Sequence, residues 1–378
     1  MAGKRRVGAF VLGGLFIAGG VGGLFYNEWR SAHRHAALAE AQSAVVTIEP
    51  DRVDPGLEGA LVHLVGPVVV EGPPRDRLFD VAVSGPRLDR TVEMYQWREL
   101  RQEADDERFR HEKVWVEGRI PSEHFRAMLG HENPDAPPFA SERFTADLVT
   151  IGRYAIGGSL IERLEADAAV PPGGNRTIEG VTLGARDGLL WAGTGAPGAP
   201  EIGDVRVFFT MVDAATLSVM GRLENGTIGD WKAANGETVA FARPEALDAA
   251  TLLADARDEE WRLTWGLRFA LTLSIFVGMW IVLRRIGRMI PWVGMLAARL
   301  LLPAAALLAL AIGLVTIALG WLIFRPLLAA SLVAVAAAVL VGLRWMRAGE
   351  GEPSLATPPP PPGRTPPPPG QTPPTPAG

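Results

Sequence analysis

The chain has 378 residues and a formal net charge of −5 that is spread along its length. Because no basic block occurs, a nucleic-acid partner is not expected. The absence of cysteine excludes disulfide bonds, thiolate metal ligands and a cysteine nucleophile. Lysine occurs only at positions 4, 113 and 232, while arginine, alanine, glycine and proline are abundant. This bias indicates a GC-rich bacterial genome and carries no functional signal.

The first apolar run, residues 7–26, carries no charge and follows Lys4, Arg5 and Arg6. A helix needs roughly 20 such residues to cross a bilayer core. A cleaved signal peptide also starts basic and then apolar, but its apolar run is shorter. The nearest small-residue cleavage pattern, at 37–39, lies far downstream. We therefore expect an uncleaved membrane anchor.

Further apolar runs occur at 264–283, 300–324 and 327–343. Tryptophans lie near their ends, as expected for rings at a membrane surface; they are Trp261, Trp265, Trp292, Trp321 and Trp345. Only Arg325 and Pro326 separate the last two runs, so these form a tight hairpin, with Pro326 suited to a helix start. The sequence therefore predicts four membrane spans.

The distribution of basic residues predicts the orientation. Most lie on one side of the four spans: Lys4, Arg5, Arg6, Arg284, Arg285, Arg288, Arg344 and Arg347. The opposite short loop has only Arg325. Positive charge in short loops faces the cytoplasm. We expect a multi-pass protein of the bacterial inner membrane, with segments 1–6, 284–299 and 344–378 cytoplasmic and segment 27–263 periplasmic.

Segment 27–263 is polar enough to be a soluble domain and combines strand-like with helix-like runs. The clearest strands are 60–70, 91–97, 112–118, 147–156, 204–212 and 216–224, with Asn225-Gly226 as a hairpin turn. Helices are expected at 121–129, with Ser122 as N-cap, at 158–166 and at 244–261. The predicted fold is an α+β extracytoplasmic domain, mainly antiparallel, inserted between one N-terminal and three C-terminal transmembrane helices. The turn-rich segment 168–180 is a candidate joint between two lobes.

The tail at 353–378 consists almost entirely of proline, glycine and threonine. Such a composition lacks the apolar residues needed for a core and favours polyproline II. We expect a disordered extension that is passive by default, with binding to a partner as the alternative.

Several short motifs follow one another in a distinctive order. They are Asn27-Glu28, "EGALVHLVG" (58–66), "RTVEMYQWRE" (90–99), "GHENP" (130–134), "IGRY" (151–154), "EIGDVRV" (201–207), "TWGLR" (264–268) and "GWLIFRPL" (320–327). Together they resemble the LUMA family, the transmembrane protein 43 family of four-span membrane proteins, over roughly residues 20–345, and identify the chain as a bacterial member. The resemblance implies proteins that organise membrane complexes and self-associate. No catalytic residue is known for the family, so none carries over.

Motif residues are the candidate interface positions. They are Glu93, Tyr95, Trp97, His131, Asn133, Asp204, Arg206, Trp265, Arg268 and Arg325. Strand alternation places Glu93, Tyr95, Trp97 and Glu99 on one face and Val92, Met94, Gln96 and Arg98 on the other. Neither face is cleanly apolar. The strand is either covered on both sides, which we favour, or presents an aromatic face to a partner.

Other candidates have a plain structural interpretation beside the functional one. "GHENP" is read as a turn in preference to a site. Arg268, one turn inside a span, is expected to reach towards the membrane surface beside Trp265, although an intramembrane charge can be functional. His33 and His35 do not share a helix face, which disfavours a metal pair, and His63 is expected to be a core histidine.

The glycines at 13, 14, 19, 20 and 23 predict a face for a partner helix within the first span. No catalytic constellation and no acidic residue within a span is evident. We therefore expect a non-enzymatic scaffold or organiser of membrane complexes, without metal or cofactor. Its expected partners are membrane lipid and membrane proteins, with homo-oligomers left open. The alternatives are a transport or channel component, and a periplasmic hydrolase.

Overall fold

The computed structural model describes residues 2–101, 109–287, 294–326 and 330. Three helices in these ranges are long and apolar enough to cross a membrane: Gly8–Ala44, Ala249–Gly287 and Leu301–Phe324. The predicted fourth span, except for residue 330, and the proline-rich tail lie outside the described residues. The chain divides into two compact units between Thr316 and Ile317, within α4 (Gly294–Phe324).

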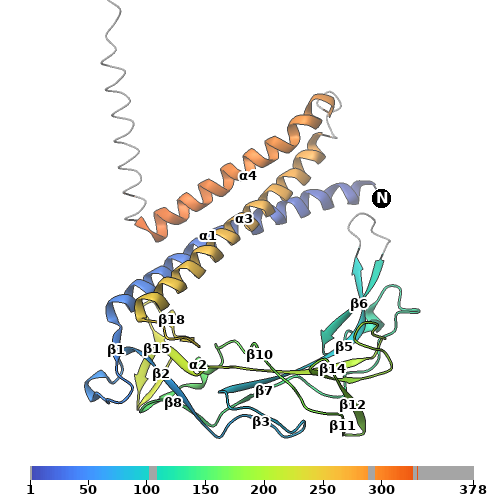
Figure 1. Ribbon diagram of the computed structural model, residues 1–378. Helices are drawn as coiled ribbons and strands as arrows, with labels where there is room; N and C mark the ends of the chain where they lie inside the picture. Colours follow the sequence, from blue (N-terminus) through green and yellow to red (C-terminus); the bar gives the residue numbers. More distant parts are fainter. Residues whose placement is uncertain (1, 102–108, 288–293, 327–329, 331–378) are drawn as a thin grey trace, which may run out of the picture. The chain divides into compact units, whose positions relative to one another are not determined.

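Two continuous helices, α1 (Ala2–Ala44) and α3 (Ala249–Gly287), lie side by side (Figure 1). Neither is interrupted at residue 26 or 263, where the apolar runs meet the polar segment. Buried positions on α1 form one stripe with steps of three, four or seven residues, namely Gly13, Gly20, Leu24, Asn27, Ser31, Leu38 and Ala41, with Glu28 and Ala37 beside it. This is the spacing of a coiled-coil seam. The seam therefore continues from the apolar part of α1 into its polar part.

Glycines allow α1 and α3 to approach closely. A Cβ atom on Gly20 would lie 2.5 Å from Ile275 Cγ1 and 2.9 Å from the carbonyl oxygen of Leu271. Gly13 and Gly23 also face α3, whereas Gly14 and Gly19 have no atom within 4 Å of a built Cβ. Three of the five predicted glycines thus face a helix of the same chain.

One sheet follows α1. Among the described residues it has seven strands in the order β1-β2-β8-β9-β16-β15-β19. The strands are β1 (Val46–Ile48), β2 (Leu61–Glu71), β8 (Leu148–Ile151), β9 (Tyr154–Ile156), β16 (Thr227–Gly229), β15 (Thr216–Glu224) and β19 (Phe241–Arg243). Strand β15 also pairs with β2, so the ring of pairings from β2 to β15 closes on itself. The interior of this ring is a cluster of buried aliphatic side chains and Tyr154.

Two turns in this sheet follow from residues that tolerate positive φ. The predicted hairpin at Asn225-Gly226 joins β15 to β16, and these residues have φ of 51° and 75°. This prediction is confirmed. Gly152, with φ of 58°, separates β8 from β9 where the sequence predicted one strand over 147–156. Its missing Cβ leaves room for the carbonyl oxygen of Pro50.

A second, eight-stranded sheet is built around the long strand β5. Its main order is β11-β12-β13-β14-β5-β6, with β10 on β14 and β7 on β5. The strands are β11 (Arg176–Ile178), β12 (Val181–Arg186), β13 (Leu189–Ala192), β14 (Val205–Met211), β5 (Arg87–Arg101), β6 (Phe109–Glu117), β10 (Ala168–Val170) and β7 (Glu142–Thr145). Nearly all pairings in both sheets are antiparallel, as predicted, the exceptions being β1–β2 and β9–β16. Both sheets combine strands from before and after 168–180, so that segment does not divide two lobes.

Short elements complete the described fold. They are β3 (Arg75–Asp76), β4 (Val81–Ala82), β17 (Trp231–Lys232), β18 (Thr238–Val239), α2 (Gly158–Ile161) and 3-10 turns at Pro55–Leu57 and Ser122–His124. The predicted helix 121–129 is wrong beyond that turn. The Ser122 hydroxyl accepts the backbone N–H of Asn133 instead of capping a helix, and Leu129 is 91% exposed. The predicted helix 158–166 is limited to α2.

The helix pair joins the seven-stranded sheet through a mixed core. Leu38 and Ala41 of α1 and Leu252 and Leu253 of α3 pack in one cluster with Phe241 of β19. The start of α3 follows from Asp248, whose carboxylate accepts the N–H of Thr251 at 2.7 Å as an N-cap. The cap lowers the pKa of Asp248.

His63 lies at this joint and is buried, as predicted. Its Nε2 lies 3.0 Å from the carbonyl oxygen of Leu247, and Nδ1 lies 3.3 Å from the Thr47 hydroxyl. These contacts suit a neutral ring that donates through Nε2 and accepts at Nδ1. Burial lowers the pKa of His63 below 6.5, although the Leu247 carbonyl and Asp248 oppose the shift.

Candidate functional site

The contact between α1 and α3 contains a buried ion pair. The guanidinium of Arg268 donates from Nε to Glu28 Oε1 at 2.7 Å and from Nη2 to Glu28 Oε2 at 2.8 Å. The side chains are 8% and 1% exposed. The Arg268 guanidinium also lies 4.7 Å from the Trp265 ring centroid. Arg268 thus lies beside Trp265, as expected, and its charge is paired with a carboxylate at the end of the first span, within the helix contact.

A second polar layer lies beside this pair. Arg30 Nη1 donates to Glu260 Oε2 at 2.8 Å. Thr264 donates its hydroxyl to Glu260 Oε1 at 2.8 Å, and Asn27 Nδ2 donates to the Thr264 carbonyl at 3.2 Å. We call the six residues of both layers the polar network: Asn27, Glu28, Arg30, Glu260, Thr264 and Arg268. All of these bonds except the one between Thr264 and Glu260 join α1 to α3, so the network couples the two helices.

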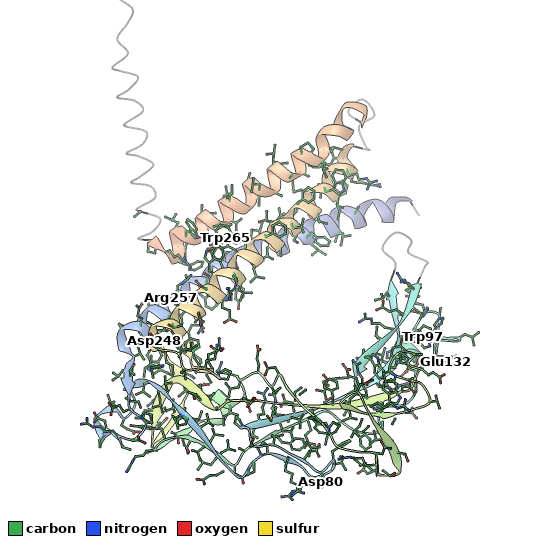
Figure 2. The ribbon with its side chains drawn as sticks, viewed as in Figure 1. Asp80, Trp97, Glu132, Asp248, Arg257 and Trp265 are labelled. Carbon is green, nitrogen blue, oxygen red and sulfur yellow. The ribbon has the colours of Figure 1, made fainter. Side chains whose placement is uncertain are left out.

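Exposed aromatic rings lie at the same level of the two helices. Trp261 and Trp265 on α3 are 59% and 50% exposed, with centroids 6.2 Å apart; Figure 2 labels Trp265 on this helix. Tyr26 and Trp29 on α1 stack at 5.5 Å. Such rings are typical of the boundary between lipid and water. The polar network therefore lies where the apolar stretches end.

The other candidate region is one face of β5 and its neighbours, which we call the aromatic face. It consists of Glu93, Tyr95, Trp97, Glu99, His111, Lys113, Trp115, Trp191 and Arg206. Registers Tyr95↔Trp115 and Trp97↔Lys113 join β5 to β6, and Arg206 lies opposite Glu93 on β14. The ring centroids of Tyr95 and Trp115 are 5.1 Å apart. Trp191 is buried and Lys113 is exposed. The side chains of His111 and Glu99 are only 7% and 11% exposed, and the others are half-buried.

Charged groups bind to the rings of this face. Arg206 donates from Nε to Glu93 Oε2 at 2.6 Å, and its guanidinium lies 4.5 Å from the Trp115 centroid. Lys113 Nζ lies 5.0 Å from the Trp97 centroid. Cation–π contacts of this length stabilise exposed sites by about 0.5–1 kcal/mol. The predicted residues Glu93, Tyr95, Trp97 and Arg206 are therefore brought together.

The opposite face of β5 is core. Val92 and Met94 are buried in the cluster of the eight-stranded sheet. Gln96, also buried, donates to the Gly118 carbonyl at 2.7 Å and accepts the Ile120 N–H at 2.8 Å. The sequence left two interpretations of β5: a strand covered on both faces, or one that presents an aromatic face to a partner. Each describes only one of its two faces. One face is core from Val92 to Gln96, with Arg98 exposed beyond it, and the other is a half-buried aromatic surface.

Asn133 holds a loop against the edge of β5. Its Oδ1 accepts the Trp97 N–H at 2.7 Å, and its Nδ2 donates to the carbonyls of Trp97 at 2.8 Å and of Ile120 at 3.1 Å. The pairing of β5 with β14 ends at Met94. Beyond it, the Asn133 side chain bonds to the backbone of Trp97 in place of a neighbouring strand. "GHENP" is a loop, in agreement with the predicted turn, and Asn133 is a structural clamp.

His131 of the same loop lies over the end of the aromatic face. Its ring stacks on His111 at 3.6 Å and meets the edge of Trp97 at 4.7 Å. Glu99 lies 3.1 Å from His111 Nε2 and accepts the backbone N–H groups of Arg126 and Ala127. Burial would raise the pKa of Glu99, but these donors and His111 outweigh it and lower that pKa. Glu99 is therefore an acceptor that fixes the loop.

The remaining predicted residues lie elsewhere. Asp204 is buried and accepts the backbone N–H groups of Gly195 and Glu201, so it shapes the turn before β14. Arg325 lies at the end of α4, where its N–H donates to the carbonyl of Trp321. Neither belongs to the polar network or to the aromatic face.

The sequence motifs included Asn27-Glu28 and, separately, Trp265 and Arg268, but did not indicate that Glu28 pairs with Arg268. Arg30 and Glu260 were not singled out. All four partners fall in the polar segment by hydropathy, and only the spacing of buried residues across residue 26 connects this segment to the span; they are Asn27, Glu28, Arg30 and Glu260. On the aromatic face, Trp115 and Lys113 alternate within the predicted strand 112–118, so the pattern contained the signal and only the pairing with β5 was unknown.

Hydroxyl groups in the spans bond to nearby backbone. Ser274 Oγ donates to the carbonyl of Phe16 at 3.0 Å, and Thr316 Oγ1 donates to that of Ile312 at 2.8 Å. Thr264 belongs to the polar network. A transport function would require such polar side chains to face a pore. In the described helices these three hydroxyl groups instead donate hydrogen bonds to other atoms of the chain.

These features define a class: a helical membrane protein whose mostly antiparallel β domain is joined to two long helices by a buried polar network. The chain matches the family profile described as Transmembrane protein 43 over residues 94–326. The chain belongs to the Transmembrane protein 43 family.

Relatives match over most of the chain. The Transmembrane protein 43 homolog of Drosophila melanogaster is 28% identical over 344 residues, covering 84% of this chain and 89% of the relative. Transmembrane protein 43 of Mus musculus is 27% identical over 333 residues, with coverage of 81% and 82%. The Homo sapiens protein is 26% identical over 329 residues, with coverage of 80% and 81%. No solved structure gives a significant match.

Proposed function

We propose that the chain is a non-enzymatic membrane scaffold that organises membrane proteins through its β domain. The observation that carries this proposal is the half-exposed aromatic face. Tryptophan, tyrosine and arginine are the residues enriched at energetically dominant positions of protein interfaces. Here Tyr95, Trp97 and Trp115 present such rings beside Arg206, on a strand whose other face is core from Val92 to Gln96.

The polar network supports the same function from the membrane side. A scaffold must hold its binding surface in a defined relation to the bilayer. The continuous helices α1 and α3 cross from apolar to polar sequence without a break, and the Glu28–Arg268 pair couples them. Motion at the membrane boundary would break this buried pair, which is costly.

For the cellular setting, we propose a bacterial inner membrane with the β domain in the periplasm and both termini in the cytoplasm. The basic residues flanking the four predicted spans support this orientation. The expected partners are membrane proteins and membrane lipid, including further copies of this chain.

Affinity capture after crosslinking in intact membranes tests the scaffold. Wild type should yield stable membrane-protein partners or homo-oligomers. Lys113→Glu reverses an exposed charge on the aromatic face and should reduce this yield, while Arg98→Glu, on the opposite face of the same sheet, should not. Recovery of monomer alone in mild detergent, or equal loss in both variants, would count against the proposal.

Trp97→Ala separates a structural role from a binding role. If the face serves binding, the variant folds and loses partners. If the ring is required as core, folded protein is lost, which circular dichroism of the purified variant would report.

Sidedness can be tested by labelling, because the chain has no cysteine of its own. A cysteine at Lys113 should react with an impermeant maleimide from the periplasm, whereas one at Lys4 should react only after the membrane is permeabilised. The reverse pattern would overturn the orientation.

A further inference from the structure

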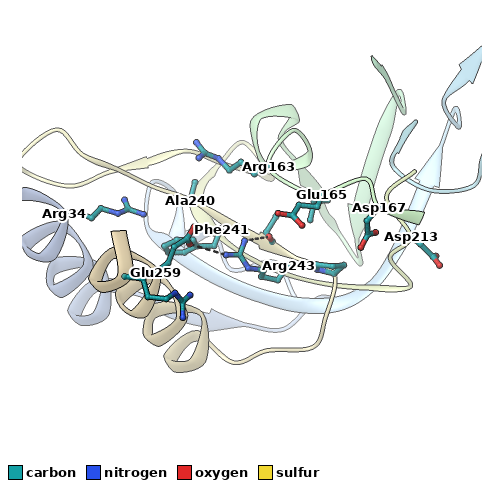
Figure 3. Close-up of a pocket in the computed structure, with 13 residues that line it drawn as sticks. Arg34, Arg163, Glu165, Asp167, Asp213, Ala240, Phe241, Arg243 and Glu259 are labelled. Carbon is teal, nitrogen blue, oxygen red and sulfur yellow. Dashed lines mark hydrogen bonds and ion pairs between the residues drawn. The ribbon is translucent and has the colours of Figure 1, made fainter. Parts of the chain in front are cut away.

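A cavity of about 570 Å³ lies where α1, α3 and the edge strand β19 meet (Figure 3). Arg34 lines it from α1, Arg243 from β19, and Glu259 and Arg262 from α3. The volume falls within the range of small-ligand sites. No residue of the polar network or of the aromatic face lines this cavity, so it is a separate feature of the fold.

Four arginines line the cavity: Arg34, Arg163, Arg243 and Arg262. Their bonding capacity is only partly used. Arg34 donates Nη1 to the Thr238 carbonyl at 2.7 Å, and Arg243 lies 3.9 Å from the Glu259 carboxylate. Arg163 forms an ion pair with Asp230 at 3.3 Å. Within the described part of the chain, Arg262 makes no ion pair. Guanidinium groups present several N–H donors in a plane, the geometry that binds phosphate oxygens.

Four carboxylates share the same cavity: Glu165, Asp167, Asp213 and Glu259. The first three form no ion pair with any described residue. An anionic ligand alone would leave these charges facing it. A ligand that carries a phosphate and an ammonium group matches both sets. A primary ammonium has three N–H donors for carboxylates, whereas a trimethylated one has none.

Arg262 lies at the depth of lipid headgroups. It precedes the apolar run of α3 by two residues, or about 3 Å of helix rise, within the roughly 5–8 Å that headgroups occupy beyond the hydrocarbon core. Exposed Trp261 and Trp265 lie at the same level of α3. Arg34 follows the apolar run of α1 by eight residues, or about 12 Å, and so lies on the water side of that layer.

We propose that this cavity binds the phosphoethanolamine headgroup of a membrane phospholipid. Arg34, Arg243 and Arg262 hold the phosphate, and Glu165, Asp167 and Asp213 accept the ammonium protons. The proposal concerns a site other than the aromatic face and does not depend on the scaffold function.

Native mass spectrometry of the full-length protein in detergent tests this site. The probes are phosphatidylethanolamine, phosphatidylcholine and phosphatidylglycerol with identical acyl chains, and soluble phosphoethanolamine. Phosphatidylethanolamine should bind most tightly. Arg262→Gln should weaken it about tenfold, the effect of losing one charged hydrogen bond. The matched control is Arg257→Gln, on the same helix but outside the cavity, which should leave binding unchanged.

A second variant tests the ammonium half of the site. Asp213→Asn should weaken phosphatidylethanolamine and leave phosphatidylglycerol unchanged or tighter, so the preference between them narrows. Equal binding of all three lipids by wild type, no effect of Arg262→Gln, or binding of soluble phosphoethanolamine without the lipid would each overturn the proposal.

Discussion

Breaking the Glu28–Arg268 pair is expected to destabilise the helix contact strongly. Two charge-assisted bonds of 2.7 and 2.8 Å join these side chains, which are 1% and 8% exposed. A bond to a charged group contributes about 1.5–3 kcal/mol, and removing one partner of a buried pair costs about 3–5 kcal/mol. Because a glutamine still offers one acceptor, Glu28→Gln should lower the free energy of unfolding by about 3 kcal/mol.

The assay is unfolding of the purified full-length protein by SDS in mixed micelles, followed by tryptophan fluorescence. Arg268→Met should cost a similar amount, and the double variant should cost clearly less than the sum, with a coupling of about 1.5 kcal/mol or more. The matched control is Glu259→Gln, since that carboxylate on the same helix is exposed and 3.9 Å from Arg243; its effect should stay below about 0.5 kcal/mol. Single variants that cost less than about 1 kcal/mol and add without coupling would refute the buried pair.

Three further predictions concern stability. Burial lowers the pKa of His63, so as the pH drops below 6.5 the unfolded chain takes up this proton before the folded chain does, and the free energy of unfolding should fall. When the melting temperature is measured against pH, His63→Gln should remove this part of the pH dependence. An unchanged pH dependence in the variant would contradict the assignment. Asn133→Ala deletes three bonds to Trp97 and Ile120 and should cost about 1–3 kcal/mol in denaturant unfolding. A change below about 0.5 kcal/mol, the size of an ordinary surface substitution, would argue against the clamp. Gly20→Ala should destabilise the helix pair because its Cβ meets Ile275, whereas Gly19→Ala, with open space, should be neutral; equal effects would contradict the packing.

Local patterns predicted those parts of the fold that depend on local chemistry. Alternation identified β2, β5, β14 and β15, and Asn225-Gly226 identified the hairpin. The sheets themselves were not predictable, because β5 pairs with β14 more than a hundred positions away. Helical spacing misled at 121–129, since Ser122 bonds to Asn133 and Leu129 faces solvent.

The candidate sites show the same distinction between local and long-range information. Tyr95 and Trp97 were predicted on one strand face, but their partners Trp115 and Lys113 became visible only with the register of β6. Hydropathy divided α1 at residue 26 and so separated Glu28 from Arg268. The seam of buried residues ignores that division, because helix packing depends on spacing and not on the surrounding solvent.

The most direct test of the scaffold function is site-specific photocrosslinking in living cells. A photoreactive amino acid at Lys113 samples the aromatic face, and one at Arg98 samples the opposite face of the same sheet. The scaffold predicts discrete adducts with membrane proteins or a second copy of the chain at Lys113 and none at Arg98. Monomer alone at both positions, or identical adducts from both, would contradict it.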